Sequence, residues 1–158
     1  MNLDISKKVA VICVILGALL GLITIIPYIN LFAFLFLTFL AAPAVIIYAK
    51  TKNIIGNIDT REGAICGAVI GAIVFSAFFI VFVPISAFVG LFYKEGVYMV
   101  MKIFFSSGAG FMTMIFSYIM IGLMVALFNA FSGIFTAYIY QQIKNITKEE
   151  NQTFKIEN

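Results

Sequence analysis

The chain has 158 residues, of which 63% are hydrophobic and 11% are charged, and its formal net charge is +3. A soluble domain carries about 25% charged residues, so this composition excludes a protein whose solvent is water alone. The small positive charge does not indicate a nucleic-acid partner, because membrane topology accounts for the basic residues. With no His and two Cys that form no CxxC pair, the sequence predicts neither a metal site nor a disulfide framework.

Three long uncharged runs separate the charged residues, and they cover residues 9–49, 63–93 and 103–143. About 20 helical residues cross a hydrocarbon core of about 30 Å. The first and third runs are each long enough for about two crossings, unless a helix breaker interrupts them. The composition therefore predicts an all-α, polytopic membrane helical bundle whose main partner is the lipid bilayer.

The first run predicts a helical hairpin. Its apolar segment 9–26 is too long for the apolar region of a typical secretory signal peptide, so we interpret it as a retained helix. A turn at residues 27–30, with Pro27 and Asn30, leads to a second helix over about 31–49. Pro43 predicts a kink in that helix, and its four phenylalanines at 32, 34, 36 and 39 favour a peripheral position.

A polar loop over residues 50–62 leads to a third helix, which the sequence predicts over about 61–83. Asp59 and Thr60 followed by Glu62 are typical of a helix N-terminus, because these side chains accept hydrogen bonds from unpaired amides. Pro84 is expected to end or bend this helix. The mixed aromatic and charged residues of the following stretch, residues 85–105, predict an interfacial segment on the membrane surface. The alternative is that this stretch extends the third helix beyond the bilayer.

Two Ser and two Gly in residues 106–110 form the next breaker, and a fourth helix is predicted over about 111–140. That helix would be about 45 Å long, so it must tilt or project from the bilayer. Residues 1–140 thus form one domain of four transmembrane helices in two hairpins. Residues 141–158 contain three Lys and three Glu and predict a solvated, frayed polar tail in the cytoplasm.

The distribution of Lys and Arg predicts the orientation of the bundle. Eight of these residues lie in the N-terminal segment, the 50–62 loop and the C-terminal tail, and two lie in the 85–105 connection. By the positive-inside rule, both termini face the cytoplasm. The heavy use of Ile, Phe, Lys and Asn is typical of an AT-rich genome, so we expect the plasma membrane of a bacterium or archaeon.

Small residues at helical spacing form the clearest pattern within the predicted crossings. Ridges of this kind let two helix backbones approach closely, which supports association where lipid leaves little hydrophobic force. Two interpretations of these ridges stay open. The ridges pack helices within one chain, or they form an interface with a second copy or with another membrane protein. The candidate helix-packing residues are Gly17, Gly21, Gly63, Gly67, Gly71, Gly122, Ala126 and Gly133.

The glycine spacing of the third helix carries a resemblance to known families. Glu62 and Gly63 begin an acid-Gly-Ala-x-x-Gly-x-x-x-Gly pattern, preceded by a helix with Gly-x-x-x-Gly and by a Pro-x-x-Asn turn. Over residues 17–71 the chain resembles small four-helix prokaryotic membrane families with a glycine-zipper helix, catalogued as domains of unknown function. The resemblance implies the fold and assigns no activity, cofactor or site residue.

The predicted crossings contain no ionisable side chain that would support proton-coupled transport. Asn129 and Ser117 are the candidates for an intramembrane polar site, and Asn129 is the stronger hydrogen-bonding group. One interpretation of Asn129 is a hydrogen bond between helices. The other is a water-accessible path shared with Ser117 and Thr136.

The sequence predicts no catalytic residue and no cofactor, because no nucleophile and base lie close together in it. The favoured hypothesis is a non-enzymatic packing or accessory component of the membrane, with Gly-rich helix interfaces. The alternative is a small channel or carrier for an uncharged or weakly polar solute.

Overall fold

The computed structural model describes residues 3–26, 28–56, 58–89, 92 and 106–156. Within these ranges the chain is helical, with turns between the helices and no strand, which confirms the all-α prediction. By length and composition, three helical stretches are able to cross a membrane: Ile29–Thr51, Thr60–Val89 and Gly108–Lys144. The described structure is therefore compatible with an integral membrane protein.

The first helix, α1, spans Leu3–Ile23 and begins six residues earlier than the sequence predicts. The amphipathic lysines at its start are compatible with helix outside a hydrocarbon layer. The chain leaves the helix through a turn in which the Thr24 hydroxyl donates to the Leu20 carbonyl at 2.7 Å. Helix ends before a proline are expected, since residue 27 disfavours helical geometry in the residue before it.

The second predicted helix consists of three parts. An α-helix, α2, spans Ile29–Leu35; a π-helical turn, η1, spans Phe36–Leu40; and a second α-helix, α3, spans Ala41–Thr51. An irregularity near Pro43 is predicted from the sequence, and the structure places it in the turn before the proline. The π-helical turn inserts an extra residue into the helix at this point.

The helix α4 spans Thr60–Val89. Its predicted N-terminal cap is confirmed, because the Asp59 carboxylate accepts from the backbone amides of Arg61 and Glu62, and Glu62 accepts from the Asp59 amide in return. The predicted end at residue 83 is wrong. Pro84 lies inside the helix, which continues because a proline removes one backbone donor and neighbouring helices support the rest.

The predicted interfacial segment is therefore wrong for residues 85–89, which belong to α4. Apart from residue 92, which lies in a turn, its other residues up to 105 lie outside the described residues.

The last helix, α6, spans Gly108–Ile156. The Ser107 hydroxyl accepts from the Gly110 amide at 3.1 Å near its first turn, within the predicted breaker. Its 49 residues correspond to about 73 Å. The prediction of a frayed tail is wrong for the backbone up to Ile156, because no Gly or Pro follows Gly133 to end the helix.

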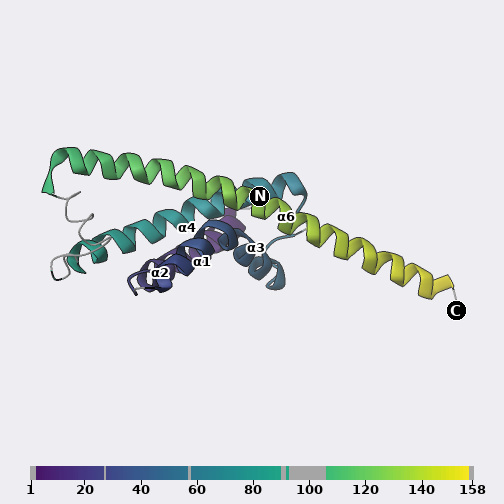
Figure 1. Ribbon diagram of the computed structural model, residues 1–158. Helices are drawn as coiled ribbons and strands as arrows, with labels where there is room; N and C mark the ends of the chain where they lie inside the picture. The colour runs from purple at the N-terminus through teal and green to yellow at the C-terminus, as the bar shows by residue number, and fades with distance from the viewer. Residues whose placement is uncertain (1–2, 27, 57, 90–91, 93–105, 157–158) are drawn as a thin grey trace.

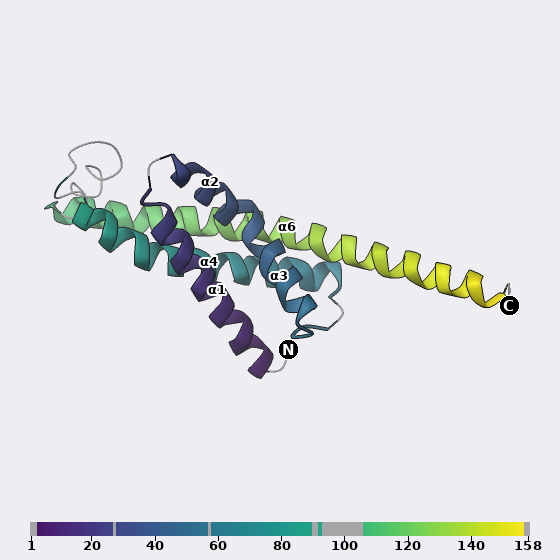
Figure 2. The same cartoon turned by 90° about the horizontal axis from the view of Figure 1, so that it is seen from below.

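Helix α4 lies between α1 and α6, and these two pairs have the most extensive contacts in the described structure. Figure 1 shows α4 and α6 side by side, and Figure 2 shows α1 crossing α4 while α6 extends past the other helices toward the C-terminus. Gly17 of α1 lies against Val74 of α4, and Gly21 lies against Val81. Since both numbers rise together, α1 and α4 run in the same direction.

Helix α6 runs opposite to α4, because Gly63 lies against Ala137 and Gly71 lies against Asn129. It runs in the same direction as the helix from Ile29 to Thr51. The rings of Phe39 and Phe128 are 5.0 Å apart, and the Lys50 ammonium lies 5.0 Å from the Tyr140 ring centre further along both helices.

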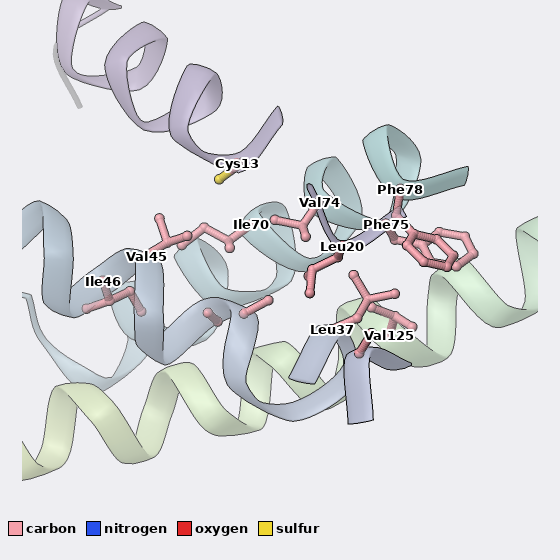
Figure 3. Close-up of a cluster of buried hydrophobic side chains, with 13 residues drawn as sticks. Cys13, Leu20, Leu37, Val45, Ile46, Ile70, Val74, Phe75, Phe78 and Val125 are labelled. Carbon is pink, nitrogen blue, oxygen red and sulfur yellow. The ribbon is translucent and has the colours of Figure 1, made fainter. Parts of the chain in front are cut away.

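The hydrophobic core lies where these helices meet, and Figure 3 shows its side chains coming from each of them. The predicted peripheral position of the 31–49 helix is wrong for its second half. Phe32, Phe34 and Phe39 are exposed and Phe36 packs against the edge of the core, whereas the small and branched residues of the second half are buried in it. The buried residues of α3 are Ala41, Ala42, Val45, Ile46 and Ala49.

Candidate functional site: a buried asparagine where three helices meet

Asn129 is fully buried in α6, at the point where α6 contacts both α4 and the η1 turn. It lies on the same face of α6 as Val125, Gly133 and Ala137, which are also buried. Residues four apart share one face of a helix, so this face carries mainly small side chains and a single amide. A buried amide is costly unless its donors and acceptor are all paired.

The Asn129 side chain is paired at both of its polar atoms. Its Oδ1 accepts from the Ala42 amide at 2.8 Å. Its Nδ2 donates to the carbonyls of Leu37 and Thr38, each at 3.0 Å, and to the Val125 carbonyl one turn earlier in α6 at 2.9 Å. Three of these four bonds join α6 to the backbone of η1 and α3.

These bonds compensate for the break in the neighbouring helix. In an α-helix the Ala42 amide would donate to the Thr38 carbonyl, and the carbonyl of Phe39 would face residue 43. Pro43 has no amide hydrogen, and the π-helical turn shifts the bonding pattern before it. The groups released by this break bond to Asn129, so they are not left unpaired in an apolar layer.

Glycines of α4 give Asn129 the room that it occupies. A Cβ atom on Gly71 would lie 2.8 Å from the Asn129 Cβ and 3.1 Å from its Nδ2. A Cβ atom on Gly67 would collide with the Asn129 carbonyl oxygen and would lie 3.0 Å from its carbonyl carbon. Any side chain at either position would displace α6 from α4.

The close approach continues along the α4–α6 contact. A Cβ atom on Gly63 would lie 2.7 Å from both the Ala137 Cβ and the Gly133 carbonyl oxygen, and one on Gly133 would collide with the Gly63 carbonyl oxygen. The backbones of the two helices therefore touch over about two turns.

The remaining small residues lie elsewhere in the bundle. Gly17 and Gly21 lie against α4, as described above, and a Cβ atom on Gly122 would lie 3.1 Å from the ring of Phe75. Ala126 is half-buried. Every candidate packing glycine thus has its close neighbours within this chain.

Ser117, the second polar candidate, lies apart from Asn129. The two residues are 12 positions apart on α6, which corresponds to about 18 Å along the helix. Thr136 donates to the Ser132 carbonyl at 2.8 Å within α6. The structure therefore separates Ser117 from Asn129, and the full burial of Asn129 leaves none of its surface exposed to a solute.

A polar contact that sequence reasoning missed lies next to Ser117. The Tyr118 hydroxyl and the Ser76 hydroxyl of α4 are 2.8 Å apart, and Ser76 also bonds the Ala72 carbonyl at 2.8 Å. The Tyr118 ring packs against Phe75 and Phe79 at centroid distances of 5.4 and 4.6 Å. Only the contact between helices reveals this pair, because the two hydroxyls are 42 residues apart.

We expect Tyr118→Phe to lower the stability of the protein slightly, because it removes one hydrogen bond and keeps the ring contacts. The expected loss in the free energy of unfolding is about 0.6 kcal/mol. Reversible unfolding in mixed micelles measures it, with Tyr138→Phe on the exposed side of α6 as the control. A loss above about 2 kcal/mol would show that the hydroxyl pair contributes more than one ordinary membrane hydrogen bond.

A shallow groove of about 390 Å³ lies between α1 and α4. Its lining is apolar except for the Ser76 hydroxyl, and neither Asn129 nor Ser117 belongs to it. Cys13 is buried and Cys66 is half-buried, and both are free. Among the described residues, no group of three or more His, Cys, Asp or Glu is placed to hold a metal ion.

Comparison of the chain with protein-family models, with curated proteins and with solved structures finds no match. The resemblance to four-helix prokaryotic families therefore stays a prediction.

Proposed function

We propose that this protein is a non-enzymatic packing or accessory component of a cell membrane. The proposal rests on the bonds that join the Asn129 side chain to the backbone of η1 and α3, which we call the Asn129 junction. Asn129 is the strongest hydrogen-bonding side chain within the predicted crossings, and it bonds the backbone of a neighbouring helix. The glycines of α1, α4 and α6 likewise contact other helices of the same chain. Both features build a stable bundle and leave no polar group at Asn129 to receive a solute.

A contact with another membrane protein would use the outer face of α6. In the most apolar part of this helix 11% of the residues are buried. The corresponding fractions are 33% in Thr60–Val89 and 39% in Ile29–Thr51. Bulky apolar side chains cover the open face, among them Leu127 and Phe135. This face is available to lipid and to a partner helix, whereas the Gly-rich faces are already occupied within the chain.

The experiment is photo-cross-linking in intact membranes with a photoreactive amino acid at Leu127 or Phe135. An accessory role predicts a cross-linked species of one discrete mass from these two positions. Val11, which is similarly exposed on α1, is the matched control and should give lipid adducts. Lipid adducts alone at all three positions would contradict an accessory role that uses α6.

The same purified protein tests the channel or carrier alternative. Proteoliposomes should take up glycerol and urea no faster than protein-free vesicles of the same lipid. A faster, saturable or inhibitor-sensitive uptake would favour the alternative over the packing role.

The topology that we propose has four crossings in two hairpins and both termini in the cytoplasm. It requires α1 and α4 to share one direction and α3 and α6 to share the other, and the contacts between the helices agree with this. It also puts Lys50, Lys52 and Arg61 on the cytoplasmic side, as the positive-inside rule expects.

Single cysteines test this topology. In intact cells, a membrane-impermeant thiol reagent should label Tyr28→Cys, since residue 28 is exposed at the outer end of α2. It should label Lys52→Cys only after the cells are opened. The reverse pattern would show that the protein has the opposite orientation, and labelling of both positions from outside would exclude a crossing by the Ile29–Thr51 helix.

A further inference from the structure

The two halves of the Ile29–Thr51 helix are held very differently. The half after the η1 turn, α3, buries five residues and contacts α1, α4 and α6. The half before it, α2, buries Ala33 alone and has its contacts with α1 and η1. The outer half is therefore attached to the bundle by one small side chain and by the geometry of the η1 turn.

That geometry has a defined alternative. A π-helical turn contains one residue more than the α-helical path that it replaces. If η1 became α-helical while α3 stayed in place, α2 would rotate by about 100°, the angle of one residue in an α-helix. Phe34 would then take the position of Ala33 against α1, and Ala33 would move to the exposed position that Phe32 now has.

Asn129 favours the observed state. Its Oδ1 bonds the Ala42 amide, which an α-helical η1 would return to the Thr38 carbonyl. Its Nδ2 bonds the carbonyls of Leu37 and Thr38. In a π-helical pattern these carbonyls would face the Ala42 amide, which donates to Asn129, and Pro43, which has no amide hydrogen. The cost of the alternative is the loss of these bonds and a phenylalanine where an alanine packs.

We propose that η1 is a register switch and that Asn129 is its latch. Releasing the amide converts η1 to an α-helix and turns α2 about its own axis, which changes the face that the outer half of this crossing presents. The rest of the bundle keeps its contacts, because α3 is fixed by α4 and α6. The two conformations differ by only a few interactions, so the protein populates both at equilibrium.

The test compares two cysteine positions in the wild-type and Asn129→Leu backgrounds. Alkylation by N-ethylmaleimide in detergent micelles is measured at Ala33→Cys and at Phe34→Cys, and peptide mass spectrometry separates them from the native cysteines. The switch predicts opposite changes in Asn129→Leu: Ala33→Cys reacts about tenfold faster or more, and Phe34→Cys reacts more slowly. Faster reaction at both positions would indicate local unfolding, and no change at either would show that Asn129 holds no register; both results overturn the proposal.

A second variant keeps the test decisive if Asn129→Leu alone fails to fold. Deleting Leu40, an exposed residue of η1, lets an ordinary α-helix place Ala33 against α1 without the latch. The deletion combined with Asn129→Leu should fold and keep Ala33→Cys unreactive. Failure of this double variant to fold, or a reactive Ala33→Cys in it, would overturn the proposal.

Discussion

Replacing Gly67 by Ala is expected to destabilise the protein by about 2 kcal/mol, and replacing it by Ile should prevent α4 and α6 from closing together. The added Cβ atom meets the carbonyl oxygen of Asn129, which belongs to the backbone of α6 and has no freedom to rotate away. The helices must separate, and the Asn129 bonds to η1 then lengthen as well. The midpoint of reversible unfolding in mixed micelles measures the loss.

Two other glycines provide matched controls for Gly67→Ala. A Cβ atom at Gly56 or at Gly108 would have no neighbouring atom within 4 Å. Gly56→Ala and Gly108→Ala should therefore leave the unfolding midpoint unchanged or raise it slightly, since Ala restricts the unfolded chain more than Gly does. Equal losses for all three substitutions would contradict a specific contact at Gly67.

Asn129→Leu is the second substitution with a large expected effect. The change keeps most of the side-chain volume but removes the partner of the Ala42 amide and of the carbonyls of Leu37 and Thr38. These groups stay unpaired in the observed π-helical register, or they pair within an α-helical η1 at the cost of the packing of Ala33. Unpaired buried backbone groups cost more than an ordinary membrane hydrogen bond contributes. We expect the free energy of unfolding to fall by about 3 kcal/mol, again measured in mixed micelles.

The same substitution at an exposed asparagine separates the junction from a general effect of removing an amide. Asn30 is exposed, and its side chain bonds the amide of the next residue at 2.7 Å. Asn30→Leu should cost about 0.5 kcal/mol or less. If Asn129→Leu lowered the free energy of unfolding no more than Asn30→Leu does, the Asn129 bonds would not be what stabilises the Ile29–Thr51 helix at its π-helical turn.

Much of the helical organisation follows from local pattern. The uncharged runs predict the long helices, and the Asp59 and Glu62 cap is predicted because its donors and acceptors lie within one turn. The ends at Val89 and Ile156 are missed for opposite reasons. The α4 helix continues through Pro84, a residue expected from the sequence to end or bend it, because the surrounding helices support the chain there. The α6 helix continues into the polar tail because that tail contains no Gly or Pro to end it, although its sequence has no apolar pattern.

The candidate site is only half predictable. Asn129 is recognised from its type and its place beside small residues, but its partners are not, because Ala42 is 87 residues away. Pro43 signals that a backbone group will lose its donor, yet the π-helical turn before it depends on the amide that a different helix supplies. Local propensity contains no information about such a contact.

The most direct test of the account is the hydration of the Asn129 side chain in a lipid bilayer. Solid-state NMR of protein labelled with 15N-asparagine measures magnetisation transfer from water to each side-chain amide, and Asn129→Leu identifies the signal. A dry packing junction predicts no transfer to Asn129 on a timescale on which exposed Asn30 and Asn53 are fully polarised. Rapid transfer from water to Asn129 would contradict the account and place the residue on a hydrated path.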